Sequence, residues 1–276
     1  MSVSIADKRR RFRDLHQSGC FVIPNPWDIG SARYLASLGF KAIASTSAGF
    51  AFSRGVPDNA VGRDAVLEHL GELVNATDLP VNADYENGFA HDPDELAENV
   101  RLGVETGIAG ISIEDSTGAA DRPLYEFDQA VARIKAARGA IDKSGSDVML
   151  VGRAECFLVG EPDIGETTRR LKAYADAGAD CLYAPGIETI EAVAAVVKAV
   201  APKPVNVLIG GPGSLTIKEV ADLGVRRVSV GGSLARAAWG GLIRAATELA
   251  EKSSFDGFSG AAPHGELNKF FRNWKQ

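Results

Sequence analysis

The chain has 276 residues, a formal net charge of -6 and 45% hydrophobic residues. These values are typical of a folded globular protein and exclude a disordered, fibrous or collagen-like chain. The acidic charge balance also disfavours nucleic-acid binding through bulk charge. Cys20, Cys156 and Cys181 are too few and too widely spaced for a disulfide framework or a metal knuckle, so we expect a cytoplasmic protein.

No segment predicts membrane insertion. The longest apolar run, Ala192 to Val200, is interrupted by Lys198 and is far shorter than the roughly 20 residues that span a bilayer. A basic cluster near the N-terminus contains Lys8, Arg9, Arg10, Arg11 and Arg13, and no signal-peptide apolar region follows it. We interpret this cluster as the solvated face of a helix.

Short apolar segments rich in Val and Ile alternate with longer segments of helical period along the chain. Segments of the first kind are typical of parallel strands buried on both faces. The predicted strands are Cys20–Pro24, Ala42–Ser45, Val81–Ala83, Gly110–Ile113, Val148–Gly152, Cys181–Ala184, Val205–Leu208 and Arg227–Val230. The predicted helices are Ser31–Leu38, Arg63–Ala76, Pro93–Thr106, Phe127–Lys143, Ile164–Ala177, Thr189–Val200, Leu215–Leu223 and Leu234–Lys252.

Eight strands that are each followed by a helix predict an α/β protein with a (β/α)₈ barrel. A recurring pattern of helix end, glycine, short turn and strand supports a repeated unit, as at Gly39, Gly107, Gly178 and Gly224. The alternative is a doubly wound open sheet, which usually carries a glycine fingerprint after its first strand. Here Pro24–Asp28 follows that strand, and it cannot cradle a pyrophosphate in the same way.

The composition changes only near the C-terminus. We therefore predict a barrel over residues 1–252 and a tail over residues 253–276. Ser253–Pro263 is rich in Gly, Ser and Ala, and Glu266–Trp274 is a candidate short helix with aromatic residues. We expect the tail to pack on the barrel or on a neighbouring subunit.

Acidic residues follow two neighbouring predicted strands, at the end where barrel enzymes carry their active sites. Asp84 and Glu86 lie two residues apart, so an extended backbone directs both to one face, and Glu114 ends the next strand. Three unpaired carboxylates repel one another and raise at least one pKa, whereas a hard divalent cation relieves the repulsion. Oxygen ligands predict Mg²⁺, with Mn²⁺ possible. The alternative is that these acids cap helices or pair with surface cations.

Other polar residues at the same end have two interpretations each. Arg153 suits a substrate carboxylate, but it can instead form an ion pair with Glu155 or Glu114. Ser45–Gly49 can bind an anion through its backbone N–H groups or form a plain turn. For the Gly231–Gly232 pair we favour close packing over a phosphate site. For Cys156 we favour inert packing over nucleophilic chemistry.

The order and spacing of several motifs resemble the isocitrate lyase/phosphoenolpyruvate mutase superfamily from Phe21 to about Ala250. The motifs are Pro24–Asp28, Ser45–Gly49, Pro57–Asp58, Asn82–Gly88, Ile113–Asp115 and Gly152–Glu155. The resemblance implies a barrel whose last helix is swapped between subunits, usually in a tetramer built as a dimer of dimers. It also implies Mg²⁺ held, partly through water, by Asp84, Glu86 and Glu114.

The resemblance further implies a small 2-oxo acid or enolate as the partner of the site. The catalytic candidates are Asp58, Arg153 and Glu114, with Asp58, or a water it holds, as the base. Ser45–Gly49 would hold the substrate carboxylate through the backbone donors of Ser47 and Gly49, helped by Arg153. The full set of expected substrate-binding residues is Trp27, Ser45, Ser47, Ala48, Gly49, Arg153, Tyr183 and Asn206.

Three departures from the family pattern narrow the expected reaction. The isocitrate and methylisocitrate lyases carry a Lys-Lys/Arg-Cys-Gly-His loop after the fourth strand, whereas this chain has Asp115–Pro123 without the cysteine. The Asn-Ser lid of the phosphonomutases has no match there. Glu86 stands where many members have Asp. What remains is a Mg²⁺-dependent lyase or hydrolase that cleaves a C–C bond of an oxaloacetate-like 2-oxo acid through an enolate. The alternatives are a phosphonomutase-type isomerase and a non-catalytic 2-oxo acid binding protein.

Overall fold

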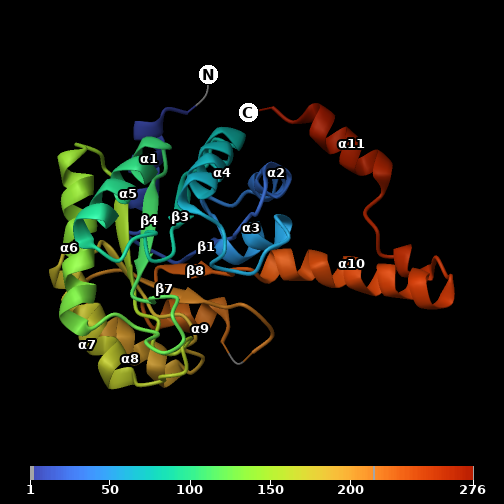
Figure 1. Cartoon of the computed structure of the whole chain (residues 1–276). Coiled ribbons are helices and arrows are strands. Elements are labelled where there is room, and N and C mark those ends of the chain that lie inside the picture. Colours follow the sequence, from blue (N-terminus) through green and yellow to red (C-terminus); the bar gives the residue numbers. More distant parts are fainter. Residues whose placement is uncertain (1–2, 214, 276) are drawn as a thin grey trace.

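The computed structural model describes residues 3–213 and 215–275, and within them eight parallel strands form a nearly closed barrel (Figure 1). The sheet order is β1-β8-β7-β6-β5-β4-β3-β2. The strands are β1 (Phe21–Ile23), β2 (Ile43–Ala44), β3 (Val81–Asp84), β4 (Gly110–Glu114), β5 (Met149–Arg153), β6 (Cys181–Tyr183), β7 (Val205–Leu208) and β8 (Arg227–Ser229). The predicted (β/α)₈ barrel is confirmed.

Helices alternate with the strands and surround them, and their bounds agree closely with the predicted segments. They are α1 (Ile5–Leu15), α2 (Ile29–Ser37), α3 (Ser47–Ser53), α4 (Arg63–Ala76), α5 (Pro93–Glu105), α6 (Phe127–Lys143), α7 (Ile164–Asp176), α8 (Ile190–Val200), α9 (Ile217–Asp222), α10 (Ser233–Lys252), the 3₁₀ helix η1 (Asp256–Phe258) and α11 (His264–Asn273). Helix α3 was not predicted, because its seven residues are too few to show a helical period.

The recurring glycines lie at the turns between helices and strands because the backbone there is left-handed. Gly39, Gly107, Gly178 and Gly224 have φ angles of 84°, 93°, 105° and 97°. Only glycine adopts this conformation without a steric penalty. The helix-glycine-strand pattern therefore recurs because each of these turns needs a left-handed backbone.

Two apolar layers stabilise the barrel. The larger layer lies between the strands and the surrounding helices and includes Leu70, Ile111 and Leu182. The smaller one occupies part of the barrel interior, where Phe12 of α1 packs with Met149 and other inward residues. Helix α1 thus supplies an aromatic plug for the barrel.

The basic cluster of α1 is not a wholly solvated face, so that prediction needs correction. The Lys8 side chain is buried, and its Nζ donates hydrogen bonds to the carbonyls of Val74 and Thr77, at 2.8 and 2.6 Å. Arg9 donates to the carbonyls of Ile108 and Val104, at 2.9 and 2.8 Å. Most of these carbonyls belong to the C-terminal ends of α4 and α5, where carbonyl groups lack helical partners and attract cations.

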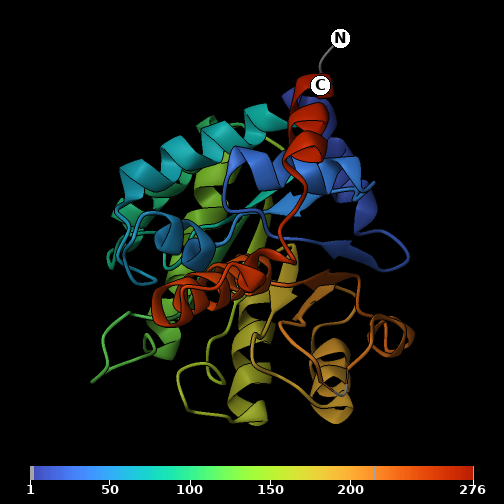
Figure 2. The same ribbon diagram turned by 90° about the vertical axis from the view of Figure 1, so that its right-hand side faces the viewer.

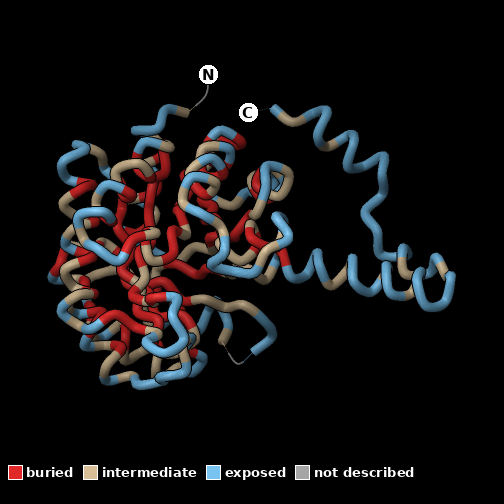
Figure 3. The backbone as a smooth tube through the Cα atoms, viewed as in Figure 1, coloured by how far each residue is buried: buried red, intermediate tan, exposed pale blue. Residues whose placement is uncertain are grey.

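Helix α10 projects away from the barrel (Figure 1), so it lies in front of the barrel in the turned view of Figure 2, and Figure 3 shows that most of its length is exposed. Ala235 is its one buried residue among those described. Helix α11 contacts α2 of the same chain, where the rings of Tyr34 and Phe270 lie edge to face with centroids 5.6 Å apart. No described helix has the length and apolar character needed to cross a membrane.

Replacing Lys8 with Met should lower the free energy of unfolding by about 2 kcal/mol, because two buried carbonyls lose a charged donor. The matched control is Arg10→Met, since Arg10 is exposed and pairs with Asp7; we expect a change within about 0.5 kcal/mol. Chemical denaturation of both variants measures the difference. Equal losses would contradict the capping role of Lys8.

Candidate active site

The C-terminal ends of the strands surround a cavity of about 190 Å³. This is the end of the barrel where catalytic residues are found in this fold. The predicted site residues that line the cavity are Ser45, Ser47, Ala48, Asp58, Asp84, Arg153, Tyr183 and Asn206. Trp27, Gly49, Glu86 and Glu114 do not line it.

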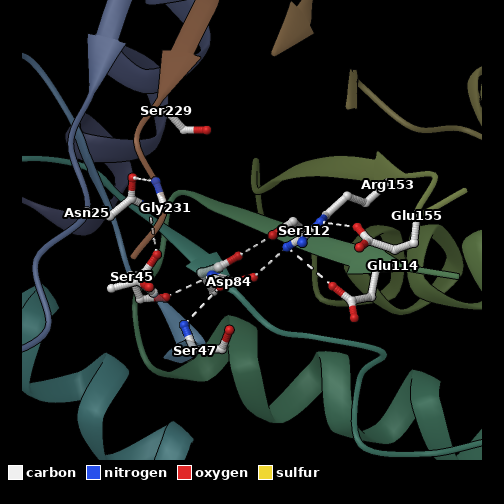
Figure 4. A network of polar contacts seen from close by, with 12 residues as sticks. Asn25, Ser45, Ser47, Asp84, Ser112, Glu114, Arg153, Glu155, Ser229 and Gly231 are labelled. Carbon is white, nitrogen blue, oxygen red and sulfur yellow. Dashed lines mark hydrogen bonds and ion pairs between the residues drawn. The ribbon is translucent and has the colours of Figure 1, made fainter. Parts of the chain in front are cut away.

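Arg153 lies among three carboxylates and forms an ion pair with each of them (Figure 4). Its Nη1 is 2.9 Å from Asp84 Oδ1 and 3.3 Å from Glu114 Oε2, and its Nε is 2.6 Å from Glu155 Oε1. The alternative interpretation of Arg153 was an ion pair with Glu155 or Glu114. Both ion pairs are present, and Asp84 is a third partner. The guanidinium holds the acidic groups in place.

The acidic residues carry the perturbed pKa values that the sequence predicts. Burial, followed by the charges of Asp84 and Asp58, raises the pKa of Glu86 to about 8. Burial also raises the pKa of Glu114 well above its ordinary value. One guanidinium thus faces more acidic groups than it can neutralise.

The local geometry of Glu86 differs from the extended backbone that was expected. Strand β3 ends at Asp84, and Glu86 has a left-handed φ of 49° in a turn where the Gly88 N–H donates to the Tyr85 carbonyl at 2.8 Å. The alternation argument for Asp84 and Glu86 is therefore wrong. The turn, and not the strand, brings Glu86 near Asp84.

The described residues contain no group of three His, Cys, Asp or Glu side chains close enough to bind a metal ion together. The expected direct convergence of Asp84, Glu86 and Glu114 is not found, because Arg153 takes oxygen atoms of Asp84 and Glu114. The donor chemistry nevertheless fits Mg²⁺, which prefers oxygen ligands and keeps several of its waters. The excess of acidic groups over Arg153 also favours a cation.

Ser45–Gly49 is the end of a strand and the start of a helix, and not a free anion-binding turn. The N–H of Ser47 donates to Asp84 Oδ2 at 2.9 Å, and that of Gly49 donates to Thr46 Oγ1 at 3.2 Å. The prediction that these two backbone donors hold a substrate carboxylate therefore needs correction, since both have protein partners. Ser45 instead accepts a hydrogen bond from the Asp84 N–H at 2.8 Å.

Gly49 and Trp27 contribute to packing beside the site. A Cβ at Gly49 would lie 3.0 Å from the Cβ of Trp27 and 3.2 Å from that of Ala235. Glycine therefore lets α3 approach both the Trp27 segment and α10. The structure brings Trp27 close to the cavity wall without exposing it to the cavity.

Asp58 and Tyr183 both reach the cavity. The Ser47 side chain interacts with Asp58, whose pKa is raised by loss of solvent and by the charge of Asp84. The Tyr183 ring centroid lies 5.0 Å from the Arg153 guanidinium carbon, and burial raises the pKa of Tyr183 to about 12. Tyr183 is therefore a neutral wall beside the charged cluster.

Asn25 links strand ends at the mouth of the barrel through hydrogen bonds. It was not singled out from the sequence. Its Oδ1 accepts hydrogen bonds from the N–H groups of Val230 and Gly231, at 3.0 and 2.9 Å, and its Nδ2 donates to the Ser45 carbonyl at 2.9 Å (Figure 4). It joins the ends of β8 and β2 where β1 and β2 do not pair. Its place in Pro24–Asp28, directly after a strand, was the available signal.

The loop after β4 is ordered by pairing across its base. Ser116 and Leu124 form an antiparallel bridge, and the Thr117 N–H donates to the Pro123 carbonyl at 2.9 Å. Asp115 holds the loop, since it accepts hydrogen bonds from Tyr174 and Arg170 at 2.5 and 3.1 Å.

The two remaining sequence candidates, Gly231–Gly232 and Cys156, differ in their relation to the cavity. Gly231 and Gly232 line it. Cys156 is buried outside its lining, and burial raises the pKa of its thiol. A raised thiol pKa agrees with packing and not with a nucleophile.

Comparison with known proteins places this site in a family. The model of phosphoenolpyruvate phosphomutase matches residues 12–250. The chain belongs to that family. This confirms the resemblance to the isocitrate lyase/phosphoenolpyruvate mutase superfamily.

Three relatives illustrate the range of the family. A Burkholderia cenocepacia J2315 structure with a provisional lyase/mutase assignment is 51% identical, with a TM-score of 0.94 over 97% of both chains. The oxaloacetate decarboxylase of Paraburkholderia xenovorans is 30% identical over 80% of this chain and 74% of its own. The structure of an oxaloacetate acetylhydrolase with the product oxalate is 25% identical, with a TM-score of 0.85 over 98% of this chain and 95% of its own. Family members are thus lyases and mutases that act on small molecules.

Replacing Arg153 with Met should lower the free energy of unfolding by about 3–5 kcal/mol, because three largely buried carboxylates lose their cation. The matched control is Arg169→Met, since Arg169 is exposed and pairs with Glu166; a loss of at most about 1 kcal/mol is expected there. Urea denaturation at neutral pH compares them. A small loss in both variants would contradict the central role of Arg153.

Proposed function

We propose that this protein is a Mg²⁺-dependent enzyme that cleaves a C–C bond of a small 2-oxo dicarboxylic acid such as oxaloacetate. The observation that carries the proposal is the small cavity at the strand ends, with Asp84, Asp58 and Arg153 in its wall. The named activities of the oxaloacetate decarboxylase and acetylhydrolase relatives support the substrate class.

The residues that would hold Mg²⁺ are Asp84, Glu86 and Glu114, partly through water. Bound magnesium would supply Lewis acidity that polarises the 2-oxo group and stabilises an enolate. Arg153 keeps Asp84 and Glu114 in fixed positions through its ion pairs. This fixed arrangement provides orientation, which lowers the barrier by reducing the entropy lost in reaching the transition state.

Asp58 is the candidate base, and its surroundings suit that role. Its raised pKa moves the carboxyl toward the pH at which a base both accepts and releases a proton readily. Asp58 and the neighbouring Ser47 both line the cavity, so the Asp58 carboxylate lies where a substrate would bind. Asp58, directly or through a water, would then exchange the proton with the substrate.

The reaction is tested by incubating the protein with oxaloacetate, 2-oxoglutarate, pyruvate and phosphonopyruvate, with Mg²⁺ and then with EDTA, followed by ¹H, ¹³C and ³¹P NMR. We expect EDTA-sensitive loss of oxaloacetate, and Asp84→Asn should lower kcat at least 100-fold with the fold kept. The matched control is Asp142→Asn, since Asp142 pairs with Arg138 on α6, outside the cavity lining; its kcat should stay within twofold.

The products distinguish the remaining reaction classes. Pyruvate and carbon dioxide indicate decarboxylation, and oxalate with acetate indicates hydrolysis. Turnover of phosphonopyruvate alone would favour the mutase-type alternative. Binding without turnover of any of these acids would contradict the enzymatic proposal and favour a binding protein. Full activity of Asp84→Asn would contradict the metal assignment.

We also propose a homo-oligomer, a dimer of dimers, in which α10 packs on a partner subunit. Support comes from the exposed apolar side chains along this projecting helix, which include Trp239, Leu242 and Ile243 with exposed fractions of 40%, 55% and 58%. Contiguous exposed apolar surface is typical of protein interfaces.

Light scattering after size-exclusion chromatography tests the assembly. The wild-type protein should have the mass of four chains, and the double variant Leu242→Asp/Ile243→Asp should approach the 29.1 kDa of one chain. The matched control is Leu38→Asp, because Leu38 is 58% exposed at the end of α2; it should keep the wild-type mass. A monomeric wild-type protein would contradict this proposal.

A further inference from the structure

The floor of the active-site cavity holds a second arginine, Arg227, which differs from Arg153 in its surroundings. The charged residues that line the cavity in the described chain are Asp58, Asp84, Arg153 and Arg227. Arg153 has three carboxylate partners. No carboxylate of residues 3–213 and 215–275 lies within ion-pair distance of Arg227.

Arg227 is buried inside the barrel and fixed by neutral groups. It is the first residue of β8, and it is 3% exposed. Its Nε donates a hydrogen bond to Asn206 Oδ1 at 2.8 Å, and its Nη1 donates to Asn82 Oδ1 at 3.2 Å. Amide oxygens orient a guanidinium but leave its charge uncompensated, and a buried unpaired charge is costly.

One nitrogen of Arg227 remains available to a ligand. No described residue accepts a hydrogen bond from Nη2. Some side-chain nitrogens in this structure are both without a partner and inaccessible to solvent, but Nη2 is not one of them. Nη2 therefore keeps access to solvent, and the cavity that Arg227 lines provides it. A guanidinium with a free edge can bind an anionic group through short charge-assisted hydrogen bonds.

The groups beside and above Arg227 do not neutralise it. Burial, followed by the charge of Arg227, lowers the pKa of His16 to about 3, so this imidazole is neutral at physiological pH. Phe12 is an apolar neighbour of His16, with ring centroids 4.8 Å apart. Above the floor, Asn206 donates its Nδ2 to Ser229 Oγ at 3.0 Å, which is again a neutral contact.

Small inward side chains leave room for a ligand to reach this floor. Ala44, Ser112 and Ser229 line the same cavity as Arg227. The mouth carries Asp58 and Asp84, which repel an anion in the absence of a bound cation. The cavity therefore has an acidic mouth and a basic floor.

We propose that Arg227 binds the second anionic group of the substrate at the cavity floor and so selects dianions over monoanions. Placing the 2-oxo carboxylate at the mouth rests on the proposed function. The group at the floor is a carboxylate or a phosphonate, since both present oxygen atoms to the free edge of the guanidinium. A purely structural Arg227, serving only as part of a polar layer with Asn82 and Asn206, is the opposing interpretation.

Binding of unreactive ligands separates this proposal from turnover. Succinate and butyrate have the same number of carbons and differ by one carboxylate, and 3-phosphonopropionate replaces one carboxylate of succinate with a phosphonate. Isothermal titration in Mg²⁺ measures all three with the wild-type protein and with Arg227→Gln. The wild-type protein should bind succinate at least tenfold more tightly than butyrate. Arg227→Gln should lose at least tenfold in succinate affinity and change butyrate affinity less than threefold.

Two further variants control for folding. Arg227→Lys keeps the charge but loses the planar fork, so it should bind succinate with an affinity between those of the wild-type and Gln proteins. It replaces Arg227→Gln if circular dichroism shows that the latter does not fold. Arg133→Lys is the matched control, because Arg133 is equally buried, donates to backbone carbonyls and lies outside the cavity lining; its succinate preference should equal that of the wild type.

The outcomes distinguish the two proposals. Any one of four results would overturn the role of Arg227. Two concern preference: the wild-type protein does not prefer succinate, or Arg227→Gln keeps that preference. Two concern affinity: Arg227→Lys binds succinate as tightly as the wild type, or Arg227→Gln loses equal affinity for succinate and butyrate. The phosphonate ligand identifies which anion the floor prefers. Succinate selectivity without turnover of any 2-oxo acid would contradict only the proposed reaction. Turnover with unchanged selectivity in Arg227→Gln would contradict only the role of Arg227.

Discussion

The guanidinium of Arg153 lies between carboxylates at the C-terminal ends of three neighbouring strands, and the geometry of the site depends on these ion pairs. Asp84 ends β3, Glu114 ends β4 and Glu155 follows β5. Like charges at this spacing would repel one another, and burial makes that repulsion stronger. One delocalised cation with a forked set of donors can bind all three at once. Arg153 is therefore best understood as the group that positions the acids.

The same interaction explains why the start of α3 is part of the site. Asp84 offers one oxygen to Arg153 and the other to the N–H of Ser47, so the strand end and the helix start share one carboxylate. A carboxylate at a helix N-terminus is favoured by the unpaired N–H groups there. Ser47 in turn contacts Asp58, the candidate base. Three segments that are distant in sequence thus converge through Asp84.

The cavity contains two arginines with opposite electrostatic settings. Arg153 at the mouth has more carboxylate partners than its single positive charge can neutralise, whereas Arg227 at the floor is held only by neutral amides. This polarity is unusual for a barrel interior, which is normally filled by apolar layers. The plug formed by Phe12 fills part of the interior from α1, and small residues leave the rest open. The arrangement provides distinct places for a cation and an anion within one small volume.

The sequence by itself determined the barrel, because strand and helix periods and the left-handed glycines are local properties of the chain. It also located the acidic residues and Arg153, since parallel strands must bring their C-terminal ends together. The tertiary structure decided which groups pair. Arg153 takes the acid oxygens, Thr46 and Asp84 take the Ser47–Gly49 donors, and Lys8 takes carbonyls of α4. Arg227 could not be assigned from sequence, because a lone strand arginine has no local signal. Pairing and burial depend on distances between segments far apart in the chain, and no local pattern encodes those distances.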